Sequence, residues 1–300
     1  MRSRARGEGA AAPATAVISA PVISAPVIAV ISATAAAAAS ACVAAHRAGY
    51  LPGGSSRWAR TNHAGEEVTL TEGVALTVGT ALPLLVADPP AAATVLGAGV
   101  AGAVDDLAGE SSTKGLRGHL SALRRGQVTT GTLKIALLGG AGLLGCAWSD
   151  ARQRSVTVPR TPHRHHSPTL HTLLGAALVA GSANLANLLD LRPGRALKVG
   201  LVHAIPLGLG GSPAAAAVGG AGLAVVADDL AGRSMLGDTG ANPLGAAVGL
   251  AAAQRLGTGG RALALLGVTG LVLLSERVSF TRVIERTPWL RALDEWGRPR

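Results

Sequence analysis

The sequence predicts an all-α protein: a polytopic transmembrane helical bundle of about nine spans with an amphipathic C-terminal helix. Of its 300 residues, 48% are hydrophobic and only 15% are charged, and the mean hydropathy is +0.38. Apolar windows recur along the chain with little polar sequence between them. These windows lack the apolar–polar alternation of barrel strands, so helices are the structures that could span a bilayer.

Nine apolar windows are the expected spans. Most are about 15–20 residues long, and a helix needs about 20 residues to cross the hydrocarbon layer, so several must extend into their flanks. Ala, Gly, Leu and Val dominate the windows, and small residues let membrane helices approach closely. The windows are 14–46, 73–87, 90–104, 131–148, 169–187, 197–210, 213–227, 241–254 and 261–275.

Three regions follow from this pattern. The basic start MRSRAR and the apolar repeat after it resemble a signal peptide in outline, but the apolar stretch is longer than a typical signal core. We therefore expect a low-complexity extension at 1–21 and a first membrane helix at about 22–46. The transmembrane domain covers 22–275, and a basic amphipathic tail at 276–300 is expected to lie on the membrane surface.

Charge predicts the orientation of the bundle. With nine spans, the loops after the odd-numbered spans, together with Lys134 at a span edge, carry 18 of the 27 basic residues, and this excess predicts that they are cytoplasmic. The same side holds 14 of the 17 acids, all except Glu8, Asp88 and Asp150. The bases are scattered over loops without an aromatic platform, so anionic lipids or phosphorylated substrates are favoured over nucleic acid. We expect a multi-pass protein of the cell membrane with its site on the cytoplasmic face.

Three polar segments at helix ends on this side could form one site. Carboxylate and amide oxygens beside several bases are what Mg²⁺ and phosphate groups require. Each segment also has an ordinary interpretation, as a solvated helix cap, a common turn or a topology signal. A second aspartate pair, Asp228–Asp229, is interpreted mainly as helix-end polarity. The segments are GAVDD with Asp105 and Asp106, SANLANLLDLRPGRALK with Asn184, Asn187, Asp190 and Arg192, and LGDTGANPLG with Asp238.

The ordered segments GAVDD, NLANLLD and MLGDTGANPLGA resemble the polyprenyl-phosphate N-acetylhexosamine-1-phosphate transferase family, which is glycosyltransferase family 4, the MraY/WecA-like group. The resemblance covers roughly 57–250. It implies a membrane enzyme that transfers a sugar-1-phosphate from a UDP-sugar to polyprenyl phosphate and releases UMP, with Mg²⁺ at a cytoplasmic-face site. The product would feed synthesis of a cell-wall or envelope glycan.

The resemblance also implies residue roles. Asp105 and Asp106 match the family's aspartate pair near the acceptor phosphate and are the expected catalytic residues. Asn187 and Asp238 match Mg²⁺ ligands. The expected substrate-binding residues are Lys114, Asn184, Asp190, Arg192 and Asn62, the last lying in RTNHAGEEV. The expected partners are polyprenyl phosphate, a UDP-sugar and membrane lipids, and a homodimer is left open.

Departures from the family pattern keep a second function open. Pro193 stands at the second acidic or amide position of the segment that begins at Asp190, and the late histidine cluster of MraY-type members is missing. A non-catalytic homologue that acts as a membrane scaffold or lipid-phosphate binder would fit these changes. The histidines of PHRHHSP fall on the opposite face, where they form either an ordinary polar loop or a metal site. A transporter is disfavoured because mid-bilayer charges and a clear internal repeat are lacking.

Overall fold

The computed structural model describes residues 23–50, 54–61, 65–108, 115–156 and 167–299, and it is almost entirely helical. The expected extension at 1–21 lies outside these residues. Within the described residues, each of the nine apolar windows coincides with a helix. These helices are α1 (Ala25–Arg47), α2 (Thr71–Ala87), α3 (Pro89–Ala108), α5 (Thr130–Val156), α6 (Pro168–Leu189), α7 (Arg195–Leu209), α8 (Pro213–Leu230), α9 (Gly237–Ala253) and α10 (Thr258–Ser275).

Short elements fill the connections between these helices. A two-stranded antiparallel sheet, which an all-α prediction did not include, precedes α2, and its register pairs Ala59 with Thr69 and Thr61 with Glu67. It is too small to change the helical character of the fold. The short elements are the 3-10 helix η1 (Ser55–Arg57), the strands β1 (Ala59–Thr61) and β2 (Glu67–Thr69), and the helices α4 (Gly115–Arg124), α11 (Phe280–Arg286) and α12 (Pro288–Glu295).

Proline marks the start of several long helices. Pro26, Pro168 and Pro213 each lie in a first helical turn, where a missing N–H costs no intrahelical hydrogen bond. Ser212 also caps α8, because its hydroxyl accepts a hydrogen bond from the N–H of Ala215 at 3.4 Å. These local signals explain why the helices begin close to the edges of the apolar windows.

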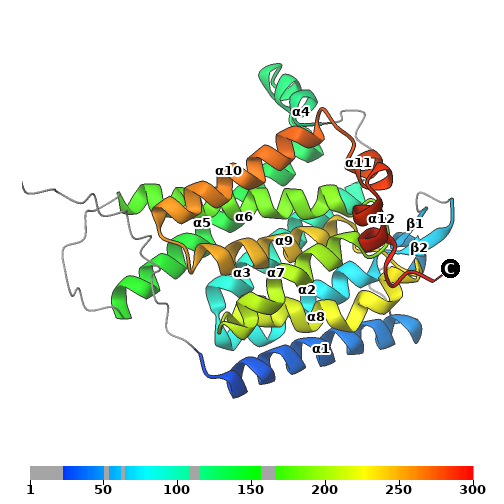
Figure 1. The fold of residues 1–300 in the computed structure, drawn as a ribbon, viewed down its shortest axis with the longest axis horizontal. Coiled ribbons are helices and arrows are strands. Elements are labelled where there is room, and N and C mark those ends of the chain that lie inside the picture. The colour runs from blue at the N-terminus through cyan, green and yellow to red at the C-terminus, as the bar shows by residue number, and fades with distance from the viewer. Residues whose placement is uncertain (1–22, 51–53, 62–64, 109–114, 157–166, 300) are drawn as a thin grey trace, which may run out of the picture.

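Helix α9 runs through the centre of the bundle (Figure 1). It contacts α2, α3, α5, α6, α7 and α8, and its Asn242, Leu244 and Leu250 side chains are completely buried. Much of the surrounding core is alanine, including Ala214–Ala217 of α8, all of them buried. Small side chains let the other helices approach α9 closely, so its N-terminal end is held firmly among them.

Five helices are long and apolar enough to cross a membrane by length and composition, namely α1, α5, α6, α8 and α10, and α2 is apolar but shorter. Exposed leucines such as Leu263 and Leu266 on α10 are typical of a surface that faces lipid. The expected count of nine spans is not confirmed. α7, for example, has 15 residues, which at 1.5 Å per residue gives about 22 Å, less than the hydrocarbon thickness.

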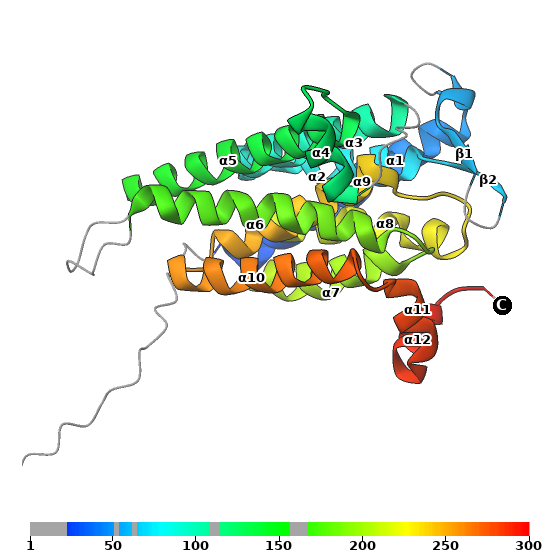
Figure 2. The ribbon, with the colours of Figure 1, turned by 90° about the horizontal axis from the view of Figure 1, so that it is seen from above.

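The C-terminal tail does not form the single helix expected over 276–300. It forms α11 and α12, which are separated because Thr287 is extended and Pro288 cannot continue the hydrogen bonding of α11. Figure 2 shows both helices lying beyond the end of α10, with α12 directed across the long axis of the bundle. They lie at the same end as the β1–β2 sheet (Figure 1).

The opposite end of the bundle is held by a buried ion pair. Arg261 donates to both carboxylate oxygens of Asp150 at 2.7 and 3.1 Å, and only 1% and 4% of these two residues is exposed. Arg261 also donates to the carbonyls of Ala253 and His171, and Thr172 donates to Asp150 at 2.7 Å. This network joins the ends of α5 and α9 to the starts of α6 and α10.

Candidate functional site

The first aspartate pair lies at the end of α3, against the start of α9. Asp106 accepts hydrogen bonds from the N–H groups of Asp238 at 3.2 Å and Thr239 at 2.8 Å, and from the Thr239 hydroxyl at 2.6 Å. The first N–H groups of a helix have no intrahelical partner, and a carboxylate there is also favoured by the helix dipole. Asp106 therefore joins the first and third sequence segments directly.

Two glycines make this junction sterically feasible. Gly237 has a φ of +57°, a left-handed conformation that glycine adopts without strain, and it turns the chain into α9 beside the Asp106 carboxylate. Gly102 of α3 lies so close to α9 that an added Cβ would be 2.1 Å from the Asp238 carbonyl oxygen. These two glycines let the end of α3 lie directly against the turn that begins α9.

A lysine from α5 completes this part of the site. Lys134 contacts the Asp238 carboxylate and lies 3.4 Å from the Asp105 carboxylate, and only 8% of Lys134 is exposed. The sequence analysis did not select Lys134 as a site residue. Lys134 could have been found from the sequence because it is a single cation just inside the apolar window 131–148. A charge in such a segment is costly and often functional.

The second segment meets the same turn through Asp190, directly after α6. The backbone of Gly237 lies near the Asp190 carboxylate. Burial and then the nearby charge of Asp229 raise the pKa of Asp190 well above its ordinary value. The Oδ2 atom of Asp190 is buried and has no hydrogen-bond partner among the described residues. An orphaned buried oxygen of this kind is satisfied when a cation or a donor group binds beside it.

The two asparagines of this segment lie half-buried on the last turns of α6. Asn184, Asn187 and Asp190 are spaced three residues apart, which puts neighbouring members on the same side of the helix. Because Gly237 lies near Asp190, and Asn187 stands one helical turn before Asp190, Asn187 is one helical turn from that junction. The structure thus brings Asp105, Asp106, Asp190 and Asp238 together around residues 237–239.

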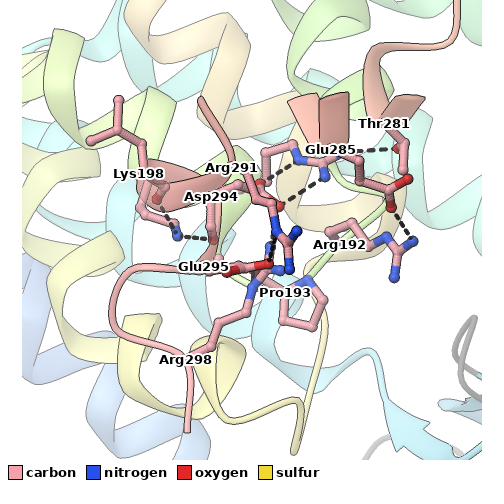
Figure 3. A network of polar contacts seen from close by, with 12 residues as sticks. Arg192, Pro193, Lys198, Thr281, Glu285, Arg291, Asp294, Glu295 and Arg298 are labelled. Atoms are coloured by element: carbon pink, nitrogen blue, oxygen red, sulfur yellow. Dashed lines mark hydrogen bonds and ion pairs between the residues drawn. The ribbon is translucent and has the colours of Figure 1, made fainter. Parts of the chain in front are cut away.

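Arg192 is directed elsewhere. Its guanidinium lies 3.0 Å from the Glu285 carboxylate of α11, so it meets the tail instead of the carboxylate cluster (Figure 3). The expected substrate-binding residues Asn62 and Lys114 lie outside the described residues, as do His163, His165 and His166. His171 is placed at the opposite end of the bundle, where its Nδ1 lies 3.0 Å from the Thr258 hydroxyl.

The second aspartate pair divides between two roles. Asp228 is half-buried and pairs with Arg47 at 2.6 Å and Arg233 at 2.5 Å. Asp229 is buried and accepts a hydrogen bond from the N–H of Gly194 at 3.0 Å. Asp228 therefore behaves as the expected polar helix end, whereas Asp229 fixes the turn that follows Asp190.

Three more polar residues support the site, and the sequence analysis did not select them. Thr239 binds Asp106 as described, and Arg60 of β1 donates to the backbone carbonyl of the same aspartate. Glu72 at the start of α2 is 1% exposed and accepts a hydrogen bond from the Ser234 hydroxyl at 2.5 Å. A buried glutamate at the edge of an apolar window was the signal that could have indicated Glu72.

The donor set fits Mg²⁺ in part. No group of three or more His, Cys, Asp or Glu side chains in the described part of the chain is arranged to hold a metal ion. Mg²⁺ does not need such a cage, because it is commonly held by one or two carboxylates with waters and substrate phosphates. Asp238, Asn187 and the unpartnered oxygen of Asp190 could supply this smaller set of oxygen ligands.

Comparison of the sequence with known protein families gave no matching family, and comparison with curated proteins gave no match. The site is therefore interpreted from its own residues and contacts, together with the motif resemblance.

Proposed function

We propose that this protein is a membrane phosphotransferase that moves a sugar-1-phosphate from a UDP-sugar to polyprenyl phosphate. The main support is the contact of Asp106 with the backbone of Asp238 and Thr239, because it unites two of the three family-like segments. The position of Gly237 near the Asp190 carboxylate adds the second segment. Segments that are far apart in the sequence thus lie together, and this supports the proposal of one shared site.

In the proposed reaction, an oxygen of the lipid phosphate attacks the sugar-proximal phosphorus of the donor. A new P–O bond forms, the bond between the two donor phosphates breaks, and UMP leaves with the bonding electron pair. Asp105 and Asp106 orient the attacking phosphate. Lys134 lies beside Asp105 and Asp238, where its charge would stabilise phosphate oxygens as negative charge develops.

Binding of the two substrates and the metal is assigned to the surrounding residues. Asn187 and Asp238 would hold Mg²⁺, which supplies charge neutralisation at the reacting phosphates. The donor would be bound by Asn184, Asp190 and Arg192, together with Asn62 and Lys114, which lie outside the described residues. Because Arg192 is paired with Glu285, donor contact by this arginine requires exchange of one anionic partner for another.

The proposal includes the membrane arrangement. All nine long helices cross the cell membrane in this scheme, and the end that carries Asp105, Asp106, Asp190 and Asp238 faces the cytoplasm. This arrangement is supported by the excess of basic residues in the loops at this end and by the five helices that have the length and hydropathy of a span. The short helices would be accommodated by flanking residues and local thinning of the bilayer.

The test is transfer of label into lipid. Purified protein is incubated with radiolabelled UDP-sugars, Mg²⁺ and polyprenyl phosphate, with an active transferase as positive control. We expect labelled lipid and equimolar UMP with at least one donor, and loss of both in Asp238→Asn. Asp88→Asn, which changes a carboxylate at the opposite end of the bundle, is the matched control and should retain turnover. Failure to label lipid with any donor would remove the catalytic proposal.

A second function is favoured by the contacts of Lys134. This buried lysine already neutralises both Asp105 and Asp238, and Pro193 replaces a polar family position. A non-catalytic scaffold or lipid-phosphate binder could be stabilised in this way without turning over a donor. Such a protein would bind polyprenyl phosphate but release no UMP in the presence of Mg²⁺ and UDP-sugars.

A further inference from the structure

The turn between α10 and α11 carries a small basic pocket. Its volume is about 200 Å³, and it is lined by Arg277, Val278, Ser279, Arg282, Val283 and Arg286. Helix α10 is a candidate span that ends at Ser275, two residues before the first of these arginines. If α10 crosses the bilayer, the pocket therefore lies at the level of the lipid headgroups.

The three arginines of this pocket lack acidic partners in the described part of the chain. Three of the tail's acids lie against other cations: Glu285 pairs with Arg192, Glu295 with Arg291, and Asp294 with Arg195 and Arg298 (Figure 3). Three like charges around one hollow repel each other unless an anion lies between them. The pocket therefore has the charge and the space to receive an anionic group.

The tail that carries the pocket is firmly anchored to the bundle. Arg195 is 4% exposed and donates to both oxygens of Asp294 at 2.7 and 3.1 Å. Lys198 donates to the carbonyls of Leu293, Asp294 and Trp296 near the end of α12. These contacts hold the tail at the end of the bundle, so the pocket is formed before any ligand arrives, which lowers the entropic cost of binding.

We propose that Arg277, Arg282 and Arg286 bind the phosphate of an anionic phospholipid headgroup. Arginine forks match phosphate oxygens geometrically and stay charged at all relevant pH values. Val278 and Val283 give the pocket an apolar wall for the part of the lipid next to the headgroup. The tail also exposes Trp289 and Trp296, residues that favour the membrane–water interface. This site is separate from the carboxylate cluster and does not depend on the proposed transferase activity.

The experiment measures lipid retention by the full chain. Purified protein in detergent is titrated with phosphatidylglycerol or phosphatidylcholine, and bound lipid is counted by native mass spectrometry. A basic residue near an anionic membrane surface contributes about fivefold in affinity, so the triple variant Arg277→Gln/Arg282→Gln/Arg286→Gln should bind phosphatidylglycerol roughly a hundredfold more weakly. Arg282→Lys, which keeps the charge but not the fork, should show an intermediate loss.

A control with the same loss of charge is Arg124→Gln/Arg125→Gln/Arg291→Gln, in which all three arginines are exposed and none lines the pocket. This control should retain phosphatidylglycerol. Equal retention by the pocket variant and the wild type overturns the proposal, as does an equal loss in the control, which would indicate general charge attraction. Inorganic phosphate is added in a separate arm. If it displaces the lipid at equal concentration, the site binds free phosphate and the lipid assignment is wrong.

Discussion

Asp106 and Thr239 are 133 positions apart in the chain, yet the carboxylate of Asp106 accepts hydrogen bonds from both the N–H and the hydroxyl of Thr239. This contact caps the central helix of the bundle with a residue proposed for catalysis. The same carboxylate therefore contributes to the stability of the fold and to the geometry of the site. Substitutions at this junction should separate the two contributions.

Thr239→Val removes the hydroxyl but leaves the backbone N–H bonded to Asp106. We expect a loss of about 1.5 kcal/mol in the free energy of unfolding, which is the low end of the range for one hydrogen bond to a charged group. Thermal unfolding in detergent measures this loss. Thr269→Val on the exposed surface of α10 is the control, and an equal effect in both variants would contradict the role of the Asp106 contact.

Gly102→Ala should push α3 away from α9. The new Cβ would lie 2.1 Å from the Asp238 carbonyl oxygen, and overpacking of this kind costs about 1–3 kcal/mol. We expect lower thermal stability and, if the protein is a transferase, a lower rate as well. Gly267→Ala is the matched control, because a Cβ there meets nothing within 4 Å. Similar behaviour of the two variants would show that the close approach is not needed.

Asp150→Ala should be strongly destabilising because it leaves the buried Arg261 guanidinium without its carboxylate. Loss of one partner of a buried pair costs about 3–5 kcal/mol, whereas an apolar replacement of both partners is often tolerated. The double variant Asp150→Leu/Arg261→Met should therefore recover much of the stability lost in Asp150→Ala. If the double variant is less stable than Asp150→Ala, the prediction is contradicted, and the ion pair itself is needed for stability.

Docking of the tail should weaken in acid. Burial acts to raise the pKa of Asp294, but hydrogen bonds and charge from Arg195, together with Arg298, outweigh it and lower the pKa below its ordinary value. The ionised Asp294 therefore stabilises the docked tail fully when the pH is above about 3.9, the pKa of an aspartate in the unfolded chain. This stabilisation is lost as the pH falls through the lower pKa that Asp294 has in the folded state. Protease cleavage within the tail should rise below about pH 4 in the wild type. Asp294→Asn should already be cleaved faster at pH 7, and its rate should lack this acid step.

Asp190 should show the reverse dependence on pH. Its pKa is raised by burial and then by the charge of Asp229, so the folded state binds its proton more tightly than the unfolded state does. Asp190 therefore destabilises the folded state once the pH rises above about 3.9, the pKa of an aspartate in the unfolded chain. This destabilisation grows as the pH approaches the higher pKa of Asp190 in the folded state. Without added divalent cations, Asp190→Asn should therefore raise the unfolding temperature at pH 7 and change it little at pH 3. An equal increase at both pH values would indicate a contribution other than ionisation.

Much of the secondary structure could be read from the chain itself. Apolar windows with little polar sequence between them predicted the nine long helices, because an apolar stretch without alternation has few other stable structures. The break at Pro288 was missed because the amphipathic pattern continues across it. The β1–β2 sheet was missed because its strands have three residues each, too few for a periodic signal.

The site divides in the same way. The sequence by itself determined which segments carry carboxylates and that they end at one side of the bundle, because helix direction alternates with each apolar window. Only the tertiary structure decided that Asp106 caps α9, that Lys134 lies beside Asp105 and Asp238, and that Arg192 turns to Glu285. Such pairings depend on which helices are neighbours and on how closely their backbones approach. The spacing of residues along the sequence contains neither kind of information.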